Sequence, residues 1–416
     1  MTKPQTDLAL LLTTQRYDAL LREAELDRNW RRAHKTSASP KKGTLFMRKL
    51  APTLFALTAL ALSACGTTFS DAPGDADPIP TALISDADLA AAPIESGGHT
   101  VDLALREIAP VPNGPETTLV AANEPTLSTQ DVLPDVGGYV VYVKQYMNTG
   151  YWSITRANQA TDQKTDLFIS IYYPTSVSIS GNGNKTYFTV DSTDESGKKV
   201  NKLYRYVSTQ NKLTELASGV GDVRNVSTSY DGGTVAWEEV RACGANLSCF
   251  KRVIVVRTYS GSSYTNKIVS LPSAPYAPSI SGDGKKLAFL TKNGSTTNVM
   301  HLYLQTNDLQ VVASTNQTWY NPSVSNNGKV AWIESASPAQ NIRIKVKTLL
   351  NGNITNVSYP SLGLYSANIT GDGTYLGFSG YKLNSTPEWE MRTMNINYNA
   401  TALVDSGNIP KAFWQK

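Results

Sequence analysis

Few residues of this chain have the types and spacing that catalysis requires. The chain holds three histidines, at positions 34, 99 and 301, and only His301 falls within the repeated region described below. One histidine cannot build a His-rich metal site, so we expect His301 to be a structural or surface residue. The segment GFSGY (377–381) does not match the G-x-S-x-G elbow of serine hydrolases. These observations predict no metal, no cofactor and no nucleophilic serine.

Carboxylate pairs are the remaining catalytic candidates. Glu238 and Glu239 are adjacent in the sequence, and neighbouring residues of a strand point to opposite faces. They therefore cannot act jointly as acid and base. Glu388 and Glu390 would share a face, but we expect a solvated strand edge there. The sequence thus predicts no catalytic residue and favours a protein that is not an enzyme.

A set of aromatic and polar residues points to binding instead. Each lies eight positions before a recurring turn glycine, and the set comprises Tyr276, Tyr320, Tyr365, Arg224 and Thr175. Trp319 and Tyr173 are close in sequence to two of them. Aromatic rings with a polar edge, together with one arginine, suit a peptide, a partner protein or the face of a sugar. The alternative is that these side chains only pack between structural elements.

The elements that would position this set are repeated hairpins. Five segments share the pattern of a strand, a tight turn and a strand that ends in an aromatic residue: SISGNGNKTYF, STSYDGGTVAW, SISGDGKKLAF, SVSNNGKVAW and NITGDGTYLGF. A weaker copy, DVGGYVVY, precedes them. The turn glycines are Gly138, Gly183, Gly232, Gly284, Gly328 and Gly373, with spacings of 45, 49, 52, 44 and 45 residues. Asn-Gly and Asp-Gly supply the positive φ angles that tight hairpin turns require.

A period in the mid-forties with four strands in each unit is typical of a β-propeller blade. Alternation of period two, as in RIKVK (343–347), supports strands rather than helices. The sequence therefore predicts an all-β, six-bladed propeller of four-stranded antiparallel blades, with seven blades as an alternative. The aromatic residues after the turns should form the core between blades; they are Tyr142, Phe188, Trp237, Phe289, Trp332 and Phe378. Either residues 100–123 or the tail KAFWQK should close the ring.

The repeat S-x-S-x-D-G-x-x-x-A-F resembles the TolB-type propeller repeat, also called PD40, a relative of WD40. The resemblance covers roughly residues 130–405. The usual proline before Asp-Gly is absent, since Gly181, Tyr230, Gly282, Asn326 and Gly371 occupy that position. The α/β domain that precedes the propeller in TolB is also missing. The resemblance therefore implies the fold, and it does not carry over the role of TolB itself.

The segment from Met47 has the order of an export signal. Arg48 and Lys49 precede an apolar run that ends in LSAC, so residues 47–64 read as a signal peptide. LSAC followed by glycine resembles a bacterial lipobox, which implies that Cys65 carries lipid. Gly66 is not an aspartate, which favours the outer membrane, facing the periplasm, or the cell surface. Residues 1–46 then read as a start-site artefact or a disordered extension.

The region between Cys65 and the propeller is acidic. No Lys or Arg occurs from Gly66 to Leu105, and Asp, Ala and Pro are frequent, which predicts a disordered stalk over residues 65–125 before a propeller over 126–416. Within it, residues 100–108 and 116–123 alternate like strands and could dock on the propeller. Residues 1–64 hold 11 of the 38 Lys and Arg and 5 of the 34 Asp and Glu, so 27 basic and 29 acidic residues remain after cleavage. A net charge of −2 gives no reason to expect a nucleic-acid partner.

The other two cysteines, Cys243 and Cys249, are separated by five residues. In an oxidising compartment such a pair most simply forms a disulfide across the end of a hairpin. Together these features favour a monomeric, lipid-anchored propeller that serves as a protein- or peptide-binding scaffold in the cell envelope. A carbohydrate-binding module or glycan sensor is the alternative, and a propeller-type hydrolase or lyase is the third class.

Overall fold

The computed structural model describes Leu89 and residues 92–120, 139–145, 151–158, 163–170, 173–193, 199–219, 223–242, 249–315, 318–336, 341–359, 362–382, 389–397, 400–407 and 411–415. All of them belong to the unit Ala76–Lys416. The predicted extension 1–46, the signal peptide 47–64 and Cys65 lie outside the described residues. No helix among the described residues is long and apolar enough to span a membrane.

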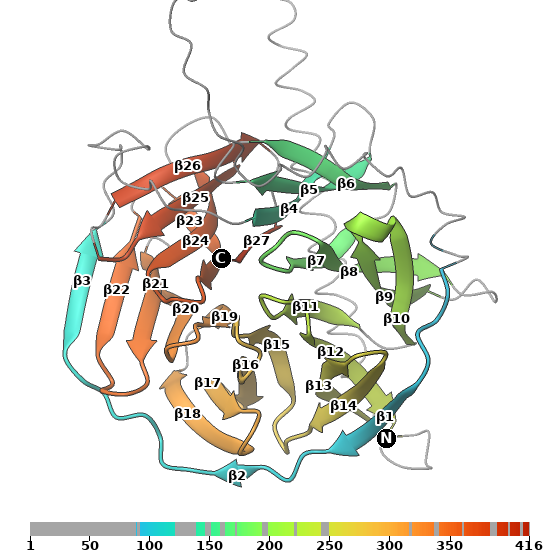
Figure 1. The fold of residues 1–416 in the computed structure, drawn as a ribbon. Coiled ribbons are helices and arrows are strands. Elements are labelled where there is room, and N and C mark those ends of the chain that lie inside the picture. The colour runs from blue at the N-terminus through green and yellow to red at the C-terminus, as the bar shows by residue number, and fades with distance from the viewer. Residues whose placement is uncertain are drawn as a thin grey trace, which may run out of the picture. The chain divides into compact units, whose positions relative to one another are not determined.

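Six antiparallel sheets surround a central axis, and each is one blade of a β-propeller (Figure 1). From the channel outwards, blade 1 consists of β27 (Lys411–Gln415), β4 (Tyr139–Gln145), β5 (Trp152–Asn158) and β6 (Lys164–Ser170). Blade 2 consists of β7 (Pro174–Ile179), β8 (Lys185–Thr193), β9 (Lys199–Val207) and β10 (Lys212–Gly219), with the 3₁₀ turn η1 (Ser208–Gln210) before β10. Blade 3 consists of β11 (Arg224–Thr228), β12 (Thr234–Ala242), β13 (Phe250–Ser260) and β14 (Ser263–Val269).

The remaining blades repeat this order. Blade 4 consists of β15 (Pro275–Ile280), β16 (Lys286–Asn293), β17 (Thr296–Tyr303) and β18 (Asp308–Thr315). Blade 5 consists of β19 (Thr318–Val324), β20 (Lys329–Ala336), β21 (Asn341–Thr348) and β22 (Ile354–Ser358). Blade 6 consists of β23 (Leu362–Ile369), β24 (Tyr375–Lys382), β25 (Trp389–Asn395) and β26 (Ala400–Gly407). The six-bladed prediction is confirmed.

The C-terminal tail closes the ring. β27 pairs with β4 and supplies the inner strand that the first repeat lacks. Of the two closing segments that the sequence suggested, the tail KAFWQK is therefore the correct one. The predicted core residues are also confirmed, because the six aromatic residues that follow the turns are at most 2% exposed. They pack in apolar clusters that lie between adjacent blades.

The repeated Ser-x-Asp-Gly sequence builds the hairpin turns. In blade 4, Ser281 Oγ donates to Asp283 Oδ1 (2.5 Å), and the same hydroxyl accepts the N–H of Lys286 (3.0 Å). Such local bonds satisfy the turn backbone, which a strand ladder cannot reach. The turn glycines adopt positive φ angles where they are described, at Gly183, Gly232, Gly284, Gly328 and Gly373. Gly138 lies outside the described residues.

The turns also bond to one another around the channel. Gly181 N–H donates to Tyr230 O of the next blade, and Tyr230 N–H donates to Gly282 O, both at 2.7 Å. Asn326 N–H donates to Gly371 O at the same distance. Proline has no N–H and could not make these bonds. This explains why three of the positions where TolB-type repeats carry proline hold another residue in this chain.

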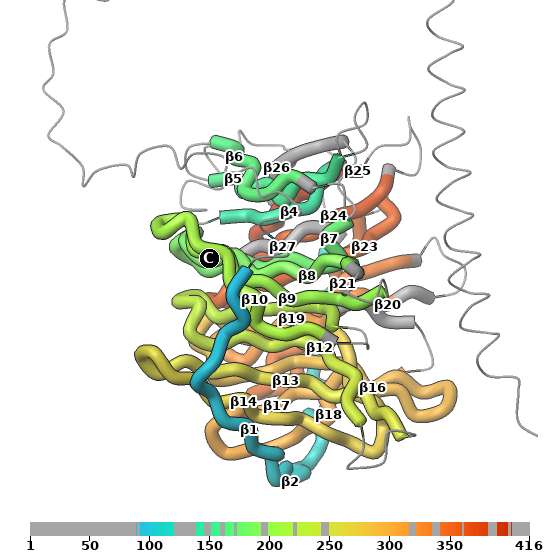
Figure 2. Tube along the Cα trace, turned by 90° about the vertical axis from the view of Figure 1, so that its right-hand side faces the viewer, coloured from blue at the N-terminus to red at the C-terminus, as the bar shows by residue number. Residues whose placement is uncertain are grey.

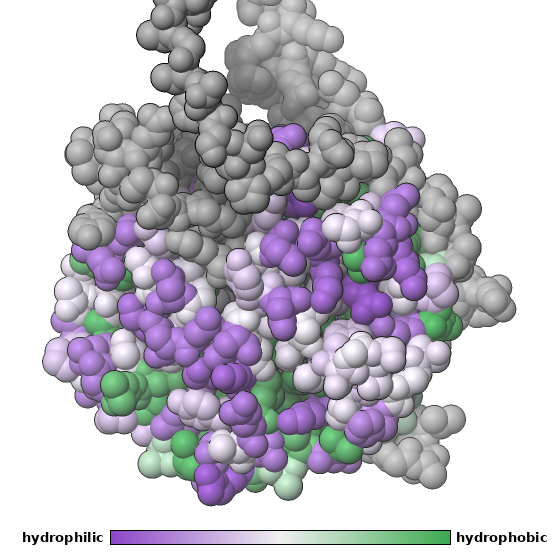
Figure 3. Space-filling view, in the orientation of Figure 1, coloured by the Kyte–Doolittle hydropathy of each residue, from purple (hydrophilic) through white to green (hydrophobic). Residues whose placement is uncertain are grey.

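On the face shown in Figure 3, hydrophilic side chains predominate around the centre.

In blades 2, 3 and 5, a serine of the S-x-S pair connects neighbouring inner strands. Ser227 Oγ of blade 3 accepts the N–H of Ile280 in blade 4 (2.9 Å), and Ser178 and Ser323 accept N–H groups of Thr228 and Ile369 in the same way (3.1 and 3.0 Å). Each inner strand is the last strand of its sheet, so one of its edges has no strand beside it. The serine hydroxyls satisfy buried donors at this edge.

An N-terminal belt, residues 92–120, runs along the outer rim of blades 2 to 5. Its strands β1 (Gly98–Asp102), β2 (Arg106–Glu107) and β3 (Glu116–Val120) pair in parallel with β14, β18 and β22, so blades 3 to 5 have five strands rather than the predicted four. Figure 2 shows β1 and β2 at this rim. Part of the predicted stalk therefore lies on the propeller. Residues 65–88, 90, 91 and 121–125 of the predicted stalk lie outside the described residues, and the stalk stays a prediction for them.

Apolar side chains explain why the belt docks. Leu103 and Leu105 pack against the cluster between blades 3 and 4, Val111 is buried between blades 4 and 5, and Leu119 packs between blades 5 and 6. The ammonium of Lys347, whose side chain is fully buried, donates to Val111 O (2.9 Å), to Asn113 Oδ1 (2.8 Å) and to Val312 O of blade 4 (2.8 Å). Burial against neutral oxygens lowers the pKa of Lys347.

The serine contacts lead to a stability prediction. Ser227→Ala should lower the free energy of unfolding by about 1–3 kcal/mol, because the buried N–H of Ile280 loses its acceptor. Urea unfolding followed by circular dichroism measures this. Ser263→Ala is the matched control, since that hydroxyl is exposed, and its effect should stay below about 0.5 kcal/mol. Equal unfolding midpoints for the two variants would show that the hydroxyl does not stabilise the ring.

Candidate ligand-binding site at the channel mouth

The predicted binding residues lie where the inner strands begin, an end of the channel that we call the mouth. At this point five inner strands carry a β-bulge, and the register shifts lie between Pro174 and Ser176, Arg224 and Ser227, Tyr276 and Ser279, Tyr320 and Ser323, and Leu364 and Ser366. A bulge changes the direction of its strand and of the adjacent side chains. The five aligned positions therefore share one local geometry, as their spacing predicts.

Blades 3 and 4 form a charged sector of the mouth. The Glu238 side chain is 2% exposed, and its Oε1 accepts the N–H of Ala277 (2.5 Å) and the side-chain amide of Asn225. Its Oε2 lies 3.7 Å from Nη1 of Arg252. Arg224 is exposed, and its backbone pairs with that of Glu238. This sector therefore presents guanidinium groups to solvent around a carboxylate that the fold holds in place.

Tyr276 belongs to the same sector but has a partly structural role. Its ring is partly buried against the core between blades 4 and 5, and its hydroxyl hydrogen-bonds with that of Thr297. Burial raises the pKa of Tyr276, with a further contribution from the nearby carboxylate of Glu238. Tyr276 thus stays a neutral hydrogen-bonding group at physiological pH.

Blade 6 and the neighbouring blades 1 and 2 form an aromatic sector. Tyr365 packs edge to face on Trp389, with ring centroids 5.3 Å apart, and Tyr381 also packs edge to face on Trp389, at 5.8 Å. Across the contact of blades 1 and 2, Trp152 packs on Tyr173 at 4.6 Å. These five rings are all partly accessible. Edge-to-face packing orients them so that a ligand meets preformed aromatic surface.

Thr175 is less available than predicted. Its hydroxyl hydrogen-bonds with that of Thr189 (2.7 Å), which also bonds with Ser176 (2.6 Å), so it belongs to a hydroxyl cluster inside blade 2. The backbone of Trp319 and Tyr320 lies in β19, but their side chains are outside the described part of the chain. Of the predicted ring, Arg224 and Tyr276 therefore lie in the charged sector and Tyr365 lies in the aromatic sector.

The catalytic candidates are held in structural contacts. Glu239 accepts from Trp237 Nε1 (3.0 Å) and Arg241 Nε (2.8 Å), so it points away from Glu238, as expected. Glu390 is 3% exposed and accepts from Arg392 (2.7 Å), so the expectation of a solvated edge is wrong for it. Glu388 lies outside the described residues. Among those described, no three His, Cys, Asp or Glu side chains could hold a metal ion together.

Cys249 directly precedes β13, whereas Cys243 lies outside the described residues. The predicted Cys243–Cys249 disulfide therefore stays a prediction. Sequence reasoning missed Trp152, Trp389 and Tyr381, because they lie on the second and third strands rather than at the aligned position. It also missed Glu95, which the belt places against two arginines of the propeller. A lone glutamate in an acidic segment carries no signal of its distant partners.

No known protein family matches this chain, and no curated protein matches it in sequence. Among solved structures, TolB from Acinetobacter baumannii is similar, with 14% identity, a TM-score of 0.53 and a match that covers 67% of each chain. A TolB candidate from Agrobacterium tumefaciens has 12% identity and a TM-score of 0.48, over 66% of this chain and 90% of that one. A chain of a nidogen–laminin complex has 10% identity and a TM-score of 0.45, over 65% and 94%. The fold of this chain is thus that of a TolB-like β-propeller.

His301 leads to a prediction about pH. The side chain is fully buried against Tyr303, neither ring nitrogen has a hydrogen-bond partner among the described residues, and burial lowers its pKa from 6.5 to about 3. Between these two pH values the unfolded chain binds a proton that the folded chain does not, so folding stability decreases as the pH falls below 6.5. His301→Leu should remove this dependence.

The difference is measurable by chemical unfolding at several pH values. Between pH 6 and 4, the free energy of unfolding of the wild type should fall more steeply than that of His301→Leu, by up to about 1.4 kcal/mol per pH unit. Carboxylates that titrate in this range are common to both proteins and cancel in the comparison. Parallel pH profiles would contradict a buried neutral histidine.

Proposed function

We propose that this chain is an exported, lipid-anchored propeller that binds a protein or peptide segment at the mouth, without catalysis, in the cell envelope. The observation that carries the proposal is the arrangement of the mouth. Blade 3, which carries Arg224 and Arg252, lies across the ring from blade 6, which carries Tyr365 and Trp389 (Figure 1). Tyr, Trp and Arg are the residue types that dominate binding energy at protein interfaces.

The burial and the contacts of the carboxylates favour binding over acid–base catalysis. Glu238 and Glu390 are almost fully buried, and each lies beside an arginine, at 3.7 Å and 2.7 Å. These contacts, together with the bond from Ala277 N–H to Glu238, hold both carboxylates in structural roles. His301 is buried, and its ring packs on Tyr303. These features support a scaffold, and the assignment as a non-enzyme is part of the proposal.

A carbohydrate-binding role is the second candidate. It is favoured by the pairs Trp152–Tyr173 and Tyr365–Trp389, which offer partly accessible aromatic surface on three consecutive blades. Such rings suit an uncharged sugar face, which makes no use of Arg224. The two candidates therefore differ in their dependence on the charged sector.

Arg224→Glu separates the two candidates. The soluble form beginning at Gly66 should capture an envelope protein by cross-linking. Arg224→Glu should reduce that capture at least about tenfold, because a carboxylate replaces the guanidinium that the partner contacts. Lys212→Glu is the matched control, since this lysine is also exposed but lies on the outer strand of blade 2. The melting temperatures of both variants are measured alongside, and the comparison requires that they agree with the wild type within about 2 °C.

Loss of capture by both variants, or by neither, would contradict a site in the charged sector. Binding of purified cell-surface glycans that survives Arg224→Glu but is lost in Tyr365→Ala would support the carbohydrate alternative. Retention of the melting temperature in Tyr365→Ala is required for that reading, because this ring also packs on Trp389.

The lipid anchor makes a separate prediction. Cys65→Ala should abolish incorporation of labelled fatty acid and move the protein from the membrane pellet to the soluble fraction, because an acyl chain contributes about 0.8 kcal/mol for each buried CH₂ group. Cys249→Ala is the control, and it should leave both readouts unchanged. Fatty-acid labelling that persists in Cys65→Ala would exclude the lipobox assignment.

A further inference from the structure

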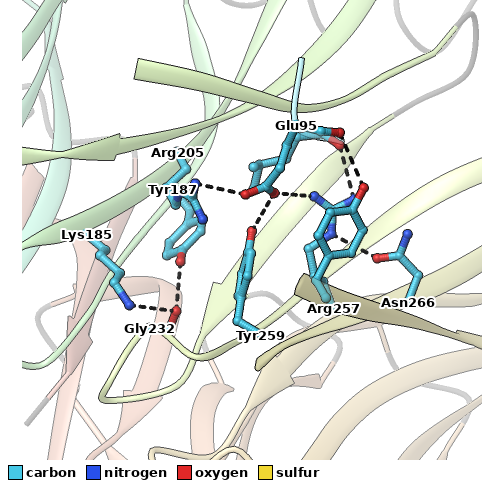
Figure 4. Close-up of polar contacts among 10 residues, drawn as sticks. Glu95, Lys185, Tyr187, Arg205, Gly232, Arg257, Tyr259 and Asn266 are labelled. Atoms are coloured by element: carbon cyan, nitrogen blue, oxygen red, sulfur yellow. Dashed lines mark hydrogen bonds and ion pairs between the residues drawn. The ribbon is translucent and has the colours of Figure 1, made fainter. Parts of the chain in front are cut away.

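The rim between blades 2 and 3 contains a group of cationic and aromatic side chains around one carboxylate of the belt (Figure 4). Glu95 Oε1 lies 2.9 Å from Nη2 of Arg205 on β9. Glu95 Oε2 lies 2.7 Å from Nη1 of Arg257 on β13 and accepts the hydroxyl of Tyr259 at 2.8 Å. Each carboxylate oxygen thus receives at least one charge-assisted contact, the strong form of hydrogen bonding in proteins.

Contacts within the propeller orient the two arginines of this site. Arg257 is 3% exposed, donates through Nε to Asn266 Oδ1 (2.9 Å), and donates through Nη2 to Leu216 O (3.3 Å). Its guanidinium lies over the ring of Tyr264, 3.8 Å from the centroid. The guanidinium of Arg205 lies over the ring of Tyr259 at 5.1 Å. The donors are therefore oriented by their own neighbours before any carboxylate arrives.

The two arginines need a negatively charged partner at this place. Two partly or fully buried guanidinium groups converge on one point, and an unpaired buried charge is costly. The Nε atom of Arg205 is buried and has no hydrogen-bond partner among the described residues. Nearby, Lys185 and Tyr187 both donate to Gly232 O. Neither of these side chains supplies a negative charge to the two arginines. Glu95 carries the negative charge that both arginines pair with.

The backbone of the belt pairs with the propeller over fewer residues here than in β1 and β3, although the Tyr264 hydroxyl also donates to Glu95 O (3.3 Å). Ile94 makes a single bridge to Glu215 of β10, with Glu95 N–H donating to Glu215 O (2.9 Å) and Glu215 N–H donating to Pro93 O (3.1 Å). In contrast, β1 and β3 each pair with an outer strand over five residues. Ile94 is 73% exposed, and Gly97 turns the chain with φ +93° before β1 begins. Residues 92–97 can leave the rim without breaking a strand ladder.

We propose that Arg205, Arg257 and Tyr259 form a carboxylate-binding site, that Glu95 is its built-in occupant, and that its ligand is an extended, glutamate-bearing segment of a partner protein. That segment replaces residues 92–97 and pairs with Glu215 as the belt does. The ligand is a carboxylate because two planar oxygens match the two guanidinium groups and the one hydroxyl. This second site lies on the rim and is independent of the mouth, so either can fail in experiment without the other.

Chemical rescue tests the carboxylate site. Glu95→Ala should melt below the wild type, and sodium acetate should raise its melting temperature by about 2–4 °C relative to sodium chloride at equal ionic strength. The wild type should not respond, because Glu95 occupies the site. Glu107→Ala, which removes an exposed belt glutamate, should behave like the wild type. Addition of Arg205→Met to Glu95→Ala should abolish the acetate response.

Exchange is tested with a labelled peptide of residues 91–100, AAPIESGGHT, by fluorescence anisotropy. The peptide should bind Glu95→Ala about tenfold more tightly than the wild type, because the built-in occupant competes. A peptide with glutamine in place of the glutamate should bind at least about tenfold more weakly. Arg224→Glu should leave this binding unchanged, which separates the rim from the mouth.

Three results would overturn the proposal: an acetate response that persists in the double variant, equal binding of the glutamate and glutamine peptides, or a folded Glu95→Ala protein that binds neither acetate nor peptide. If Glu95→Ala does not fold, Glu95→Gln is used for the peptide measurement, because its amide keeps the volume of the glutamate without its charge. Failure of folded Glu95→Gln to bind the glutamate peptide more tightly than the wild type would equally refute an exchangeable site.

Discussion

Hydrogen bonding at the free edges of the inner strands is the constraint on which this structure depends. A ring of small sheets leaves one strand edge of every blade at the channel, where its N–H groups have no ladder partner. The hydroxyls of Ser178, Ser227 and Ser323 fill this role between neighbouring blades, and backbone bonds such as that from Gly181 to Tyr230 join the turns. The repeated S-x-S-x-D-G motif is thus an inter-blade connector as well as a turn.

The outer strands of the blades also have free edges, and in blades 3 to 5 the belt covers them. Parallel belt strands cover the outer edges of blades 3 to 5, and apolar side chains such as Val111 fill the ends of the cores between blades. Two buried polar contacts fasten the belt, Lys347 at blades 4 and 5 and Glu95 at blades 2 and 3. The belt therefore joins blades that are otherwise connected only through their neighbours, and its two attachments use charges of opposite sign.

The binding surfaces are consequences of these connections. The bulges at the start of the inner strands lie directly after Arg224 and Tyr276, where the strands leave their regular ladders. Glu238 crosses from blade 3 to the backbone of Ala277 in blade 4, so the same carboxylate stabilises the ring and shapes the charged sector. Structure and candidate site therefore share residues here.

Local chemistry made much of the fold predictable. Turn glycines, strand alternation and a repeat of 44 to 52 residues act over short distances, so the blades, their core aromatic residues and the aligned mouth positions could be inferred from the sequence. The choice of β27 as the closing strand, the course of the belt and the pairing of Glu95 with Arg257, 162 residues away, could not. Those contacts join segments whose local sequence patterns are compatible with several different pairing partners in the fold. Only the packing of the closed ring decides which segments meet, because burial and charge pairing depend on the whole assembly rather than on neighbouring residues.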